Sequence, residues 1–453
     1  MAAGKLGGEA LASTKAMRIH GKWYDMRGFD HPGGPIMLSL GQGRDATALF
    51  EVHHPFTSRP KLEAILAKYE TKEPCRLLDE RDTGEEFEWP EVEQKDGGAR
   101  TEAPISDFAF EVRQKVRAYF QAEAKRRGVS LLAATKATPA RWLELGILFA
   151  IFVATLPGCF RGDLLALVAM SITYWVLGVN LLHDGSHFGL AQDWRINALG
   201  TYWGWYFSSP LEWYHQHVIG HHVYANIPNK DPDLYHNASM ERHTKTLRWR
   251  PMHAHQAFTW APIWIIGTYA MSFIKPVQMF LTGEYNRSLK MMELSPSRVT
   301  IHWAGRVITW LLCYALPFVI FPTWKAFLFA TLPVTITSVS FMLSSQVNHL
   351  TPANVDQYDS DFYKHQVMTS HTIAHNSYAT FLFTGGLNYQ IEHHLFPTVN
   401  HCHHRHIQPI VKAVCDKYSV PYNYTPTLYG AFRKYLDHLV ELGVKPQAAQ
   451  KAE

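Results

Sequence analysis

The fold is decided by one stretch of sequence, LLALVAMSITYWVLGVNLL at 164–182, which continues directly into HDGSH at 183–187. An apolar helix of this length crosses the ~30 Å of hydrocarbon in a bilayer. His183 and His187 lie four positions apart, so a helix places both imidazoles on one face. The stretch therefore predicts a membrane helix that ends in two side chains able to share a metal ion.

Apolar stretches of similar length on either side predict further membrane helices. The stretch 142–160 is joined to 164–182 by a short turn, and 303–321 is joined to 326–347 by Pro322-Thr-Trp-Lys. Each pair is expected to form a hairpin. Basic residues just before the first hairpin place that side in the cytosol by the positive-inside rule; they are Lys125, Arg126, Arg127, Lys136 and Arg141.

A fifth apolar stretch, 257–274, is assigned by counting membrane crossings. The histidines at 183–222 can meet those at 349, 393 and 394 only if an even number of crossings separates them, and the hairpin at 303–347 already supplies two. We therefore expect 257–274 to lie in the membrane interface as an amphipathic helix. The stretch 196–213, rich in Trp, Tyr and Gly, is expected to do the same.

Two further histidine motifs follow the first. His217-Val-Ile-Gly-His221-His222 repeats the four-residue spacing and adds a neighbour about 100° round the helix, so one segment can serve two metals. Gln390-Ile-Glu-His393-His394 places Gln390, His393 and His394 at positions i, i+3 and i+4, which supplies a third helical face for ligands. Three such motifs beside membrane helices predict a metal site.

Two further sets of histidines in the C-terminal part of the sequence are not expected to bind metal. His371 and His375 have the same four-residue spacing, but in isolation, and we expect the cluster at 401–406 to lie at the surface.

The chain of 453 residues has 26 histidines and a net charge of only +4, and this small charge indicates no nucleic-acid partner. The five cysteines are scattered and form no C-x-x-C pair, so neither a disulfide framework nor a thiolate metal cage is predicted.

A separate histidine pair lies near the N-terminus. His31 opens His-Pro-Gly-Gly, and His53 and His54 follow about two dozen positions later. Two such histidines could clamp a haem iron from both faces, which leaves no open position for oxygen and suits electron transfer. The alternative is a turn with incidental histidines.

The choice of metal at the three motifs rests on this haem module. Imidazole binds iron, zinc and copper alike, but an electron donor on the same chain indicates redox chemistry, and therefore iron. A carboxylate-bridged di-iron site would need several Glu-x-x-His pairs. Glu212 and His215 form one such pair, but Asp184 and Glu392 do not complete the pattern and are better suited to orienting imidazoles.

The haem motif resembles cytochrome b5, in which the H-P-G-G histidine is one axial ligand. That resemblance implies haem b, with His31 and His54 as its ligands and the adjacent His53 as the less favoured choice for the second. It also implies NADH-cytochrome b5 reductase as the partner that reduces the haem. The stretch before Met17 is short for that fold, so a first strand or helix is expected to be truncated.

With its three histidine motifs in this order, the chain resembles the front-end fatty acyl desaturases over nearly its whole length. Gln390 marks that subfamily, because related desaturases have histidine there. One departure is Met368, in a V-M-T-S stretch where relatives often have V-E-T. Other similar stretches are WYHQHVIGHH at 213–222, NIPNKDPD at 226–233 and LNYQIEHHLFP at 387–397.

The resemblance implies two iron ions, O2 as co-substrate and NADH as the indirect electron source. The substrate would be a fatty acyl chain on a phospholipid or on coenzyme A. Gln390 would be a weak or water-mediated ligand. The implied iron ligands are His183, His187, His217, His221, His222, His349, His393 and His394.

The expected architecture is a small α+β cytochrome b5-like domain followed by an all-α integral membrane domain. That domain would have four transmembrane helices in two hairpins, interfacial helices and a cytosolic cap. The expected location is the endoplasmic reticulum membrane, with the haem domain and the histidine motifs facing the cytosol. The expected boundaries are 16–70 for the haem domain, 71–135 for a linker, 136–425 for the desaturase domain and 426–453 for a C-terminal tail.

Similarity favours a Δ5 desaturase, with Δ4, Δ6 and Δ8 positions open. A hydroxylase, an epoxidase or a sphingoid-base desaturase could use the same metal scaffold. A membrane zinc hydrolase, a receptor-like histidine protein and a pure electron-transfer protein are rivals of other classes. The chemistry itself favours an iron enzyme, because no side-chain base deprotonates an unactivated alkyl chain at neutral pH.

Overall fold

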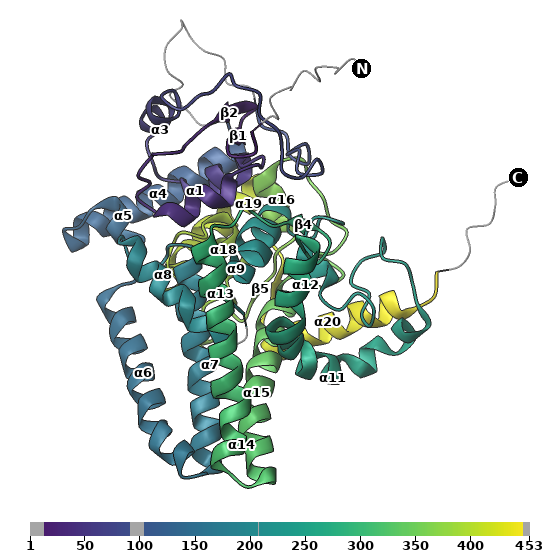
Figure 1. Cartoon of the computed structure of the whole chain (residues 1–453). Helices are drawn as coiled ribbons and strands as arrows, with labels where there is room; N and C mark the ends of the chain where they lie inside the picture. Colours follow the sequence, from purple (N-terminus) through teal and green to yellow (C-terminus); the bar gives the residue numbers. More distant parts are fainter. Residues whose placement is uncertain (1–12, 91–103, 207, 447–453) are drawn as a thin grey trace, which may run out of the picture.

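Long apolar helices form a stalk beneath a broad cap in the computed structural model, which describes residues 13–90, 104–206 and 208–446 (Figure 1). The stalk holds α6, α7 and α15 and the nearly continuous run of α13, η7 and α14. Their bounds are α6 Pro139–Phe160, α7 Leu164–Ser186, α13 Pro296–Thr309, η7 Trp310–Ala315, α14 Leu316–Ile320 and α15 Thr323–His349. The helices predicted at 142–160, 164–182, 303–321 and 326–347 therefore form, in two hairpins.

Local sequence explains where the first stalk helices begin. Thr138 caps α6 by accepting a hydrogen bond from the backbone N–H of Arg141, and Pro139 follows at the first helical position. Asp163 caps α7 by accepting from the backbone N–H groups of Leu165 and Ala166. The short turn between the two caps makes α6 and α7 antiparallel neighbours.

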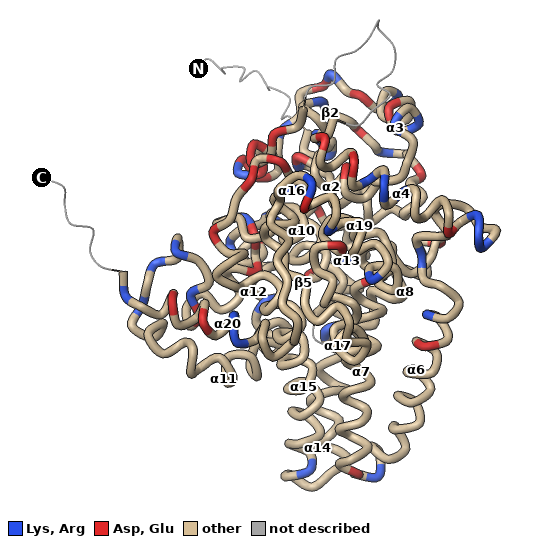
Figure 2. The backbone as a smooth tube through the Cα atoms, turned by 180° about the vertical axis from the view of Figure 1, so that it is seen from behind, with Lys and Arg blue, Asp and Glu red and all other residues tan. Residues whose placement is uncertain are grey.

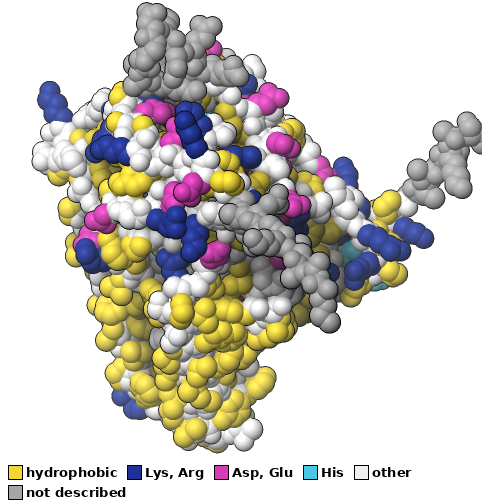
Figure 3. Space-filling view, turned by 45° about the horizontal axis from the view of Figure 1, so that its top comes forward, with side chains coloured by type: hydrophobic (Ala, Val, Ile, Leu, Met, Phe, Trp, Pro, Cys, Tyr) yellow, Lys and Arg dark blue, Asp and Glu magenta, His cyan; other side chains and the backbone are white. Residues whose placement is uncertain are grey.

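The stalk surface is suited to lipid. Leu143, Ile147 and Leu165 are 67%, 53% and 83% exposed, far more than soluble proteins allow in a contiguous patch of large apolar side chains. Charged residues gather in the cap and at the stalk's base, while the length between them carries almost none (Figures 2 and 3). The long apolar helices indicate a membrane protein.

A fifth helical segment is also long and apolar enough to cross a membrane among the described residues. It runs from Pro251 to Thr282, and its α11 part lies across the stalk direction with α20 along it (Figure 1). Its parts are η5 Pro251–His255, α11 Gln256–Tyr269, η6 Ala270–Ile274 and α12 Lys275–Thr282, and α20 spans Leu428–Gly443.

The N-terminal region is a small α+β unit at the top of the cap. Its antiparallel strand pair, β1 with β2, packs with three helices around a core of Met17, Ile19, Tyr24 and Leu66. The elements are β1 Met17–Ile19, β2 Lys22–Tyr24, α1 Pro35–Gly41, α2 Thr47–His53 and α3 Arg59–Leu66.

This unit shares its packing with the rest of the cap. Ala48 and Val52 of α2 belong to the same buried apolar core as Leu395 and Phe396. Leu40 of α1 packs in a second core with Ile219. Because apolar cores hold their parts closely, the unit is docked on the cap.

The segments expected to be a linker and a tail contain packed helices. In the range 71–135, α4 (Asp107–Arg127) contributes Phe108 and Phe120 to the core of the cap and packs against α19 (His404–Lys417). In the range 426–453, α20 contributes Tyr435 and Leu439. Residues 91–103 and 447–453 of those two segments, and residues 1–12 at the N-terminus, lie outside the described part of the chain.

Short elements complete the cap. The stretch 196–213, expected in the interface, contains α8, η2 and α9, and its residue 207 lies outside the described part. The elements are α4 Asp107–Arg127, α5 Leu131–Ala134, α8 Trp194–Tyr202, η2 Trp203–Tyr206, α9 Pro210–Trp213, η3 Tyr214–His221, α10 His222–Tyr224, η4 Pro232–Tyr235, β3 Glu284–Tyr285, β4 Leu289–Lys290, α16 Phe362–Met368, β5 Thr372–Ile373, α17 Tyr378–Thr384, α18 Gln390–Leu395, η8 His401–His403, α19 His404–Lys417 and β6 Tyr424–Thr425.

Candidate metal centre

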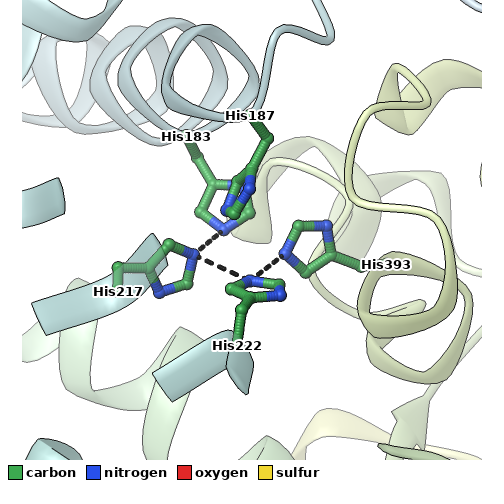
Figure 4. A group of neighbouring side chains, drawn as sticks. All are labelled: His183, His187, His217, His222 and His393. Atoms are coloured by element: carbon green, nitrogen blue, oxygen red, sulfur yellow. Dashed lines mark hydrogen bonds between the residues drawn. The ribbon is translucent and has the colours of Figure 1, made fainter. Parts of the chain in front are cut away.

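Histidines from distant parts of the chain converge where the stalk meets the cap. They form two buried groups, and within each group one nitrogen per ring lies within 4.8 Å of the others. Figure 4 shows the first group, in which rings from three segments face a common centre. The first group is His183, His187, His217, His222 and His393, and the second is His221, His349 and His394. Every predicted ligand histidine of the three motifs, and His349, lies in one of the two groups.

The histidines of the second motif are divided between the two groups, but the division is not the one expected from an α-helix. Tyr214–His221 is a π-helix, in which the backbone N–H of His222 donates to the carbonyl of His217. Five-residue spacing therefore brings His217 and His222 together, with 3.2 Å between their Nε2 atoms, while His221 points to the second group. The predicted pairing of His217 with His221 at one metal was wrong. Their rings stack with 5.7 Å between centroids, but the wider π-turn groups His217 with His222.

Gly220 makes room for this arrangement. A Cβ atom at this position would lie 2.6 Å from the ring of Pro232, closer than real contacts allow. The loop that carries Pro232 also carries Asp231 and Asp233, both of which face His221. The glycine of H-V-I-G-H-H thus lets an acidic loop approach the second motif.

The nitrogen spacings fit bound metal ions. Nε2 of His217 lies 2.8 Å from Nε2 of His183, and Nε2 of His222 lies 2.9 Å from Nε2 of His393. In the second group, Nε2 of His221 lies 3.2 Å from Nε2 of His349. Nitrogens that bind one ion at ~2.1 Å lie ~3.0–3.4 Å from each other. The 3.2 Å spacing falls in this range and the 2.8 and 2.9 Å spacings fall just below it, so the rings are close enough to share an ion.

Burial keeps most of these rings in the form that binds metals. It holds the pKa values of His217, His222, His393 and His394 well below their usual range, and neighbouring histidines lower them further. Both ring nitrogens of His187 are buried and lack a hydrogen-bond partner among the described residues. A neutral imidazole offers a lone pair, and an orphaned buried nitrogen is explained when an ion occupies that lone pair.

Outer partners orient every ring of the second group. Nδ1 of His349 donates to the carbonyl of Thr369 at 2.9 Å, and Nδ1 of His394 donates to Oε1 of Gln366 at 2.7 Å. Nδ1 of His221 donates to Asp231 at 3.1 Å. With the proton fixed on Nδ1, each Nε2 lone pair faces the centre.

Asp231 and Asp233 also set the charge of the second group. Burial opposes a positive charge on His221, but these two carboxylates outweigh it and raise the pKa of His221 to about 9. A site that favours an imidazolium equally favours a metal cation bound to that imidazole. Neither aspartate was predicted as a functional residue, although both lie in the N-I-P-N-K-D-P-D stretch.

Gln390 lies beside the second group but presents its nitrogen. Its Oε1 accepts a hydrogen bond from Asn348 at 3.1 Å, and its Nε2 lies 2.8 Å from Nε2 of His349. An amide nitrogen has no lone pair for a metal. In this orientation Gln390 is a neighbour of the centre, and direct ligation would require the amide to turn over.

The histidines at 401–406 are not all at the surface, which corrects the prediction. His401, His403 and His404 are buried, and only His406 of the four is exposed. Nε2 of His401 lies 3.1 Å from Nδ1 of His183 and 3.4 Å from Oδ1 of Asp184. The turn after α18 folds back over the first group, and no local pattern in the sequence signals that return.

The acidic residues considered for a carboxylate-bridged site have other roles. Glu212 forms a capping box with Ser209, and burial raises its pKa to about 7. His215 donates from Nδ1 to the carbonyl of Leu211, and its Nε2 accepts from the backbone N–H of Met292. Oδ2 of Asp184 accepts from Asn400 at 2.9 Å, as expected of a residue that supports neighbouring ligands.

Glu392 and the isolated pair of histidines lie outside both groups. Burial raises the pKa of Glu392 to about 8, and its Oε1 accepts from the hydroxyl of Tyr422 at 2.8 Å. His371 is hydrogen-bonded to Asn354 and Thr425, and His375 contacts the ring of Tyr424. Neither histidine belongs to a candidate metal group among the described residues.

The N-terminal unit brings the rings of His31 and His54 close together, with their planes nearly perpendicular at 84°. Their ring centroids lie 5.9 Å apart, and burial lowers both pKa values, that of His31 to about 4. Two imidazoles that bind one iron at ~2 Å on opposite sides have centroids ~6 Å apart, so the pair fits a haem iron between them. His53 turns away from this pair, towards His187.

Comparisons with known proteins cover the membrane region and extend to the N-terminal unit. The family described as "Fatty acid desaturase" matches residues 162–426. An "Acyl-lipid (8-3)-desaturase" of Mortierella alpina is 28% identical over 95% of this chain and 94% of its own length. One of the same name from Physcomitrium patens is 30% identical over 94% and 88%. A "Probable Delta(5) fatty acid desaturase C" of Dictyostelium discoideum is 26% identical over 96% and 93%.

Proposed function

The chain belongs to the fatty acid desaturase family, and on that basis we propose that it inserts a cis double bond into a long-chain polyunsaturated fatty acyl substrate. The reaction converts two adjacent methylenes and O2, with two electrons and two protons, into an alkene and two water molecules. The observation that carries this proposal is the meeting of two buried imidazole groups at the cap end of an apolar stalk.

We assign one iron ion to each histidine group. His183, His187, His217, His222 and His393 would hold the first, and His221, His349 and His394 would hold the second. When bound, the irons would supply the oxidising power, drawn from O2, that removes hydrogen from an unactivated alkyl chain. The second group has fewer histidines, and Gln390 completes it through a water molecule, since its oxygen is already engaged with Asn348.

The chain's own residues hold these ligands in place. Asp231, Thr369 and Gln366 fix protons on the outer nitrogens of the second group, so its lone pairs face inward. Burial keeps water from competing for the same positions. Such outer partners change metal affinity or activity by about 10–100-fold when they are lost.

The N-terminal unit, residues 16–70, is assigned as a cytochrome b5-like domain with haem b between His31 and His54. Two neighbouring rings whose pKa values are lowered by burial, with centroids 5.9 Å apart, support this assignment. Electrons would reach the haem from NADH through a separate cytochrome b5 reductase. Two protein ligands leave the haem iron no open position, so its role would be electron transfer.

The membrane arrangement follows from the stalk. Two hairpins, α6 with α7 and α13–α14 with α15, would give four crossings, and α11 would lie in the interface because it runs across the stalk. The cap and the N-terminal unit would face the cytosol at the endoplasmic reticulum membrane. The desaturase domain would span 136–425, with 71–135 and 426–453 as the connecting and terminal segments.

The double-bond position is proposed to be Δ5. The named relatives support it, since two of those in Dictyostelium carry Delta(5) in their names. Δ4, Δ6 and Δ8 are the alternatives, as are hydroxylation, epoxidation and sphingoid-base desaturation on the same metal scaffold. The acyl group would be carried on a phospholipid or on coenzyme A.

A feeding experiment tests this proposal. Yeast that expresses the chain is supplied with one polyunsaturated fatty acid at a time, and mass spectrometry locates any new double bond. A new bond at carbon 5, absent with a His222→Ala chain, is the expected result. A hydroxylated, epoxidised or sphingoid product would replace the proposed reaction, and a bond at carbon 4, 6 or 8 would replace only its position.

A further inference from the structure

Two adjacent histidines at the end of α2 face two different centres. The ring of His54 lies 5.9 Å from that of His31, in the haem pair. The ring of His53 lies 6.3 Å from that of His187, and the two planes are within 25° of parallel. His187 belongs to the first metal group, so a single peptide link joins the residues that face the two centres.

The local bonding of His53 holds its ring in this direction. Its Nδ1 donates to the carbonyl of Leu49 at 2.9 Å, one turn earlier in α2. Its Nε2 is buried and has no hydrogen-bond partner among the described residues. An unpaired buried polar atom is destabilising, so packing alone does not favour histidine here.

The gap between His53 and His187 is fixed by the docking of α2. Val52, next to His53, is buried in the same core as Leu395 and Phe396. Phe56 stacks on Phe396, with 5.7 Å between ring centroids and 12° between their planes. Both oxygens of Glu51 are bound by arginines, including Arg113 of α4 at 3.2 Å. The N-terminal unit therefore does not need to find the metal centre by diffusion.

Electron tunnelling is slower across empty space than through bonded or closely packed atoms. From His54 the path runs through the peptide link and the His53 ring, and it leaves the covalent chain only between His53 and His187. Removing the His53 ring would lengthen that step and leave its space empty or filled by water.

We propose that His53 is a positioning residue that couples the haem to the first metal group through His187. The inference rests on the proposed haem at His31 and His54. With both cofactors bound, each transfer would move one electron and no atom. The haem iron would be oxidised from ferrous to ferric, one iron of the centre would be reduced from ferric to ferrous, and His53 would end unchanged. Two transfers supply the two electrons of one desaturation, and the reductase replaces them from NADH.

The test follows internal electron transfer without O2 and without lipid substrate. The haem of the purified full chain is reduced by a laser flash with deazaflavin, and the decay of the ferrous-haem absorbance is recorded. His53→Ala should slow this decay by about tenfold or more, the scale on which residues just outside a ligand set act. His53→Phe, which keeps a ring in the gap, should stay within about threefold of the unaltered chain. His255→Ala, at an exposed position, should change nothing.

Each other outcome decides against the proposal. A His53→Ala chain that decays at the unaltered rate, or a His53→Phe chain as slow as His53→Ala, shows that the ring does not carry the coupling. Loss of iron in His53→Ala shows that His53 holds the metal instead. If the unaltered chain itself shows no decay, or decays equally after iron is removed by His222→Ala, the proposed route from haem to iron has failed and the function must be revised.

Discussion

The protein holds its histidines in two contrasting ways. In the N-terminal unit, two nearly perpendicular rings lie 5.9 Å apart, and among the described residues no candidate metal group of three or more side chains includes either of them. At the metal centre, eight rings from four separate segments crowd into two groups. A porphyrin brings four ligands of its own, so the protein adds only two, whereas a bare ion takes most of its ligands from the protein. The number of converging imidazoles therefore reveals which kind of cofactor each region suits.

The largest expected effect separates the two regions by single substitutions. His222→Ala should abolish product and lower bound iron, since His222 contacts both His217 and His393, while the haem absorbance remains. His54→Ala should abolish the haem absorbance and NADH-driven turnover while the iron remains. Haem spectra, iron analysis and product analysis on both variants check this. A variant that loses both cofactors without unfolding would erase the contrast between the regions.

A smaller effect is expected one step outside the metal groups. Asp231→Asn should lower metal affinity or activity by about 10–100-fold, because Nδ1 of His221 loses its carboxylate partner. Metal titration of the purified chain measures it. Asp416→Asn is the matched control, since that exposed aspartate pairs only with Lys412 in the described structure. Equal metal affinity in the two variants would contradict the assigned role of Asp231.

The cluster at 401–406 offers an internal comparison. His401→Gln should reduce activity by about tenfold, because Nδ1 of His183 loses the partner that fixes its proton. His406→Gln, in the same cluster but exposed, should leave activity unchanged. Turnover measured at saturating iron distinguishes them. Equal activities would show that burial near the ligands does not make His401 part of the site.

The smallest effect concerns the docking of the N-terminal unit. Glu51→Gln should lower the free energy of unfolding by about 1–3 kcal/mol, because Arg59 and Arg113 lose their charged partner. Burial opposes its charge, but His20 and the two arginines outweigh burial and lower the pKa of Glu51 to about 2, from an ordinary value of 4.5. The stabilisation that charged Glu51 provides is therefore present above pH 4.5 and is lost as the pH falls towards 2.

Thermal unfolding, followed by the haem absorbance, measures the loss of stability in Glu51→Gln. Glu63→Gln is the control, because Glu63 is partly exposed and pairs only with Arg59 in the described structure. An equal loss of stability in both variants would show that the buried network around Glu51 does not hold the unit on the cap.

Much of the architecture could be predicted from sequence because it depends on local composition. Hydropathy alone locates the stalk helices, since a span must be long and apolar whatever it packs against. The three histidine motifs likewise identify histidines that converge. The grouping could not be predicted, because the π-helix at 214–221 depends on packing and sets His217 with His222 instead of with His221.

The residues that were missed act through contacts distant in sequence. His401 meets His183, and Asp231 meets His221 across the loop admitted by Gly220. His53 was read only as the neighbour of a haem ligand, because nothing in the sequence shows that α2 docks against the first metal group. Each of these roles depends on which surfaces fold together, and no local pattern encodes that.

The metal content of the purified protein tests the central claim most directly. Non-haem iron is measured by mass spectrometry of the metals, and haem is measured by its absorbance on the same sample. The account predicts about two non-haem irons per haem, in keeping with one ion in each histidine group. A protein that carries zinc in place of iron, or that holds haem but no further metal, would contradict it.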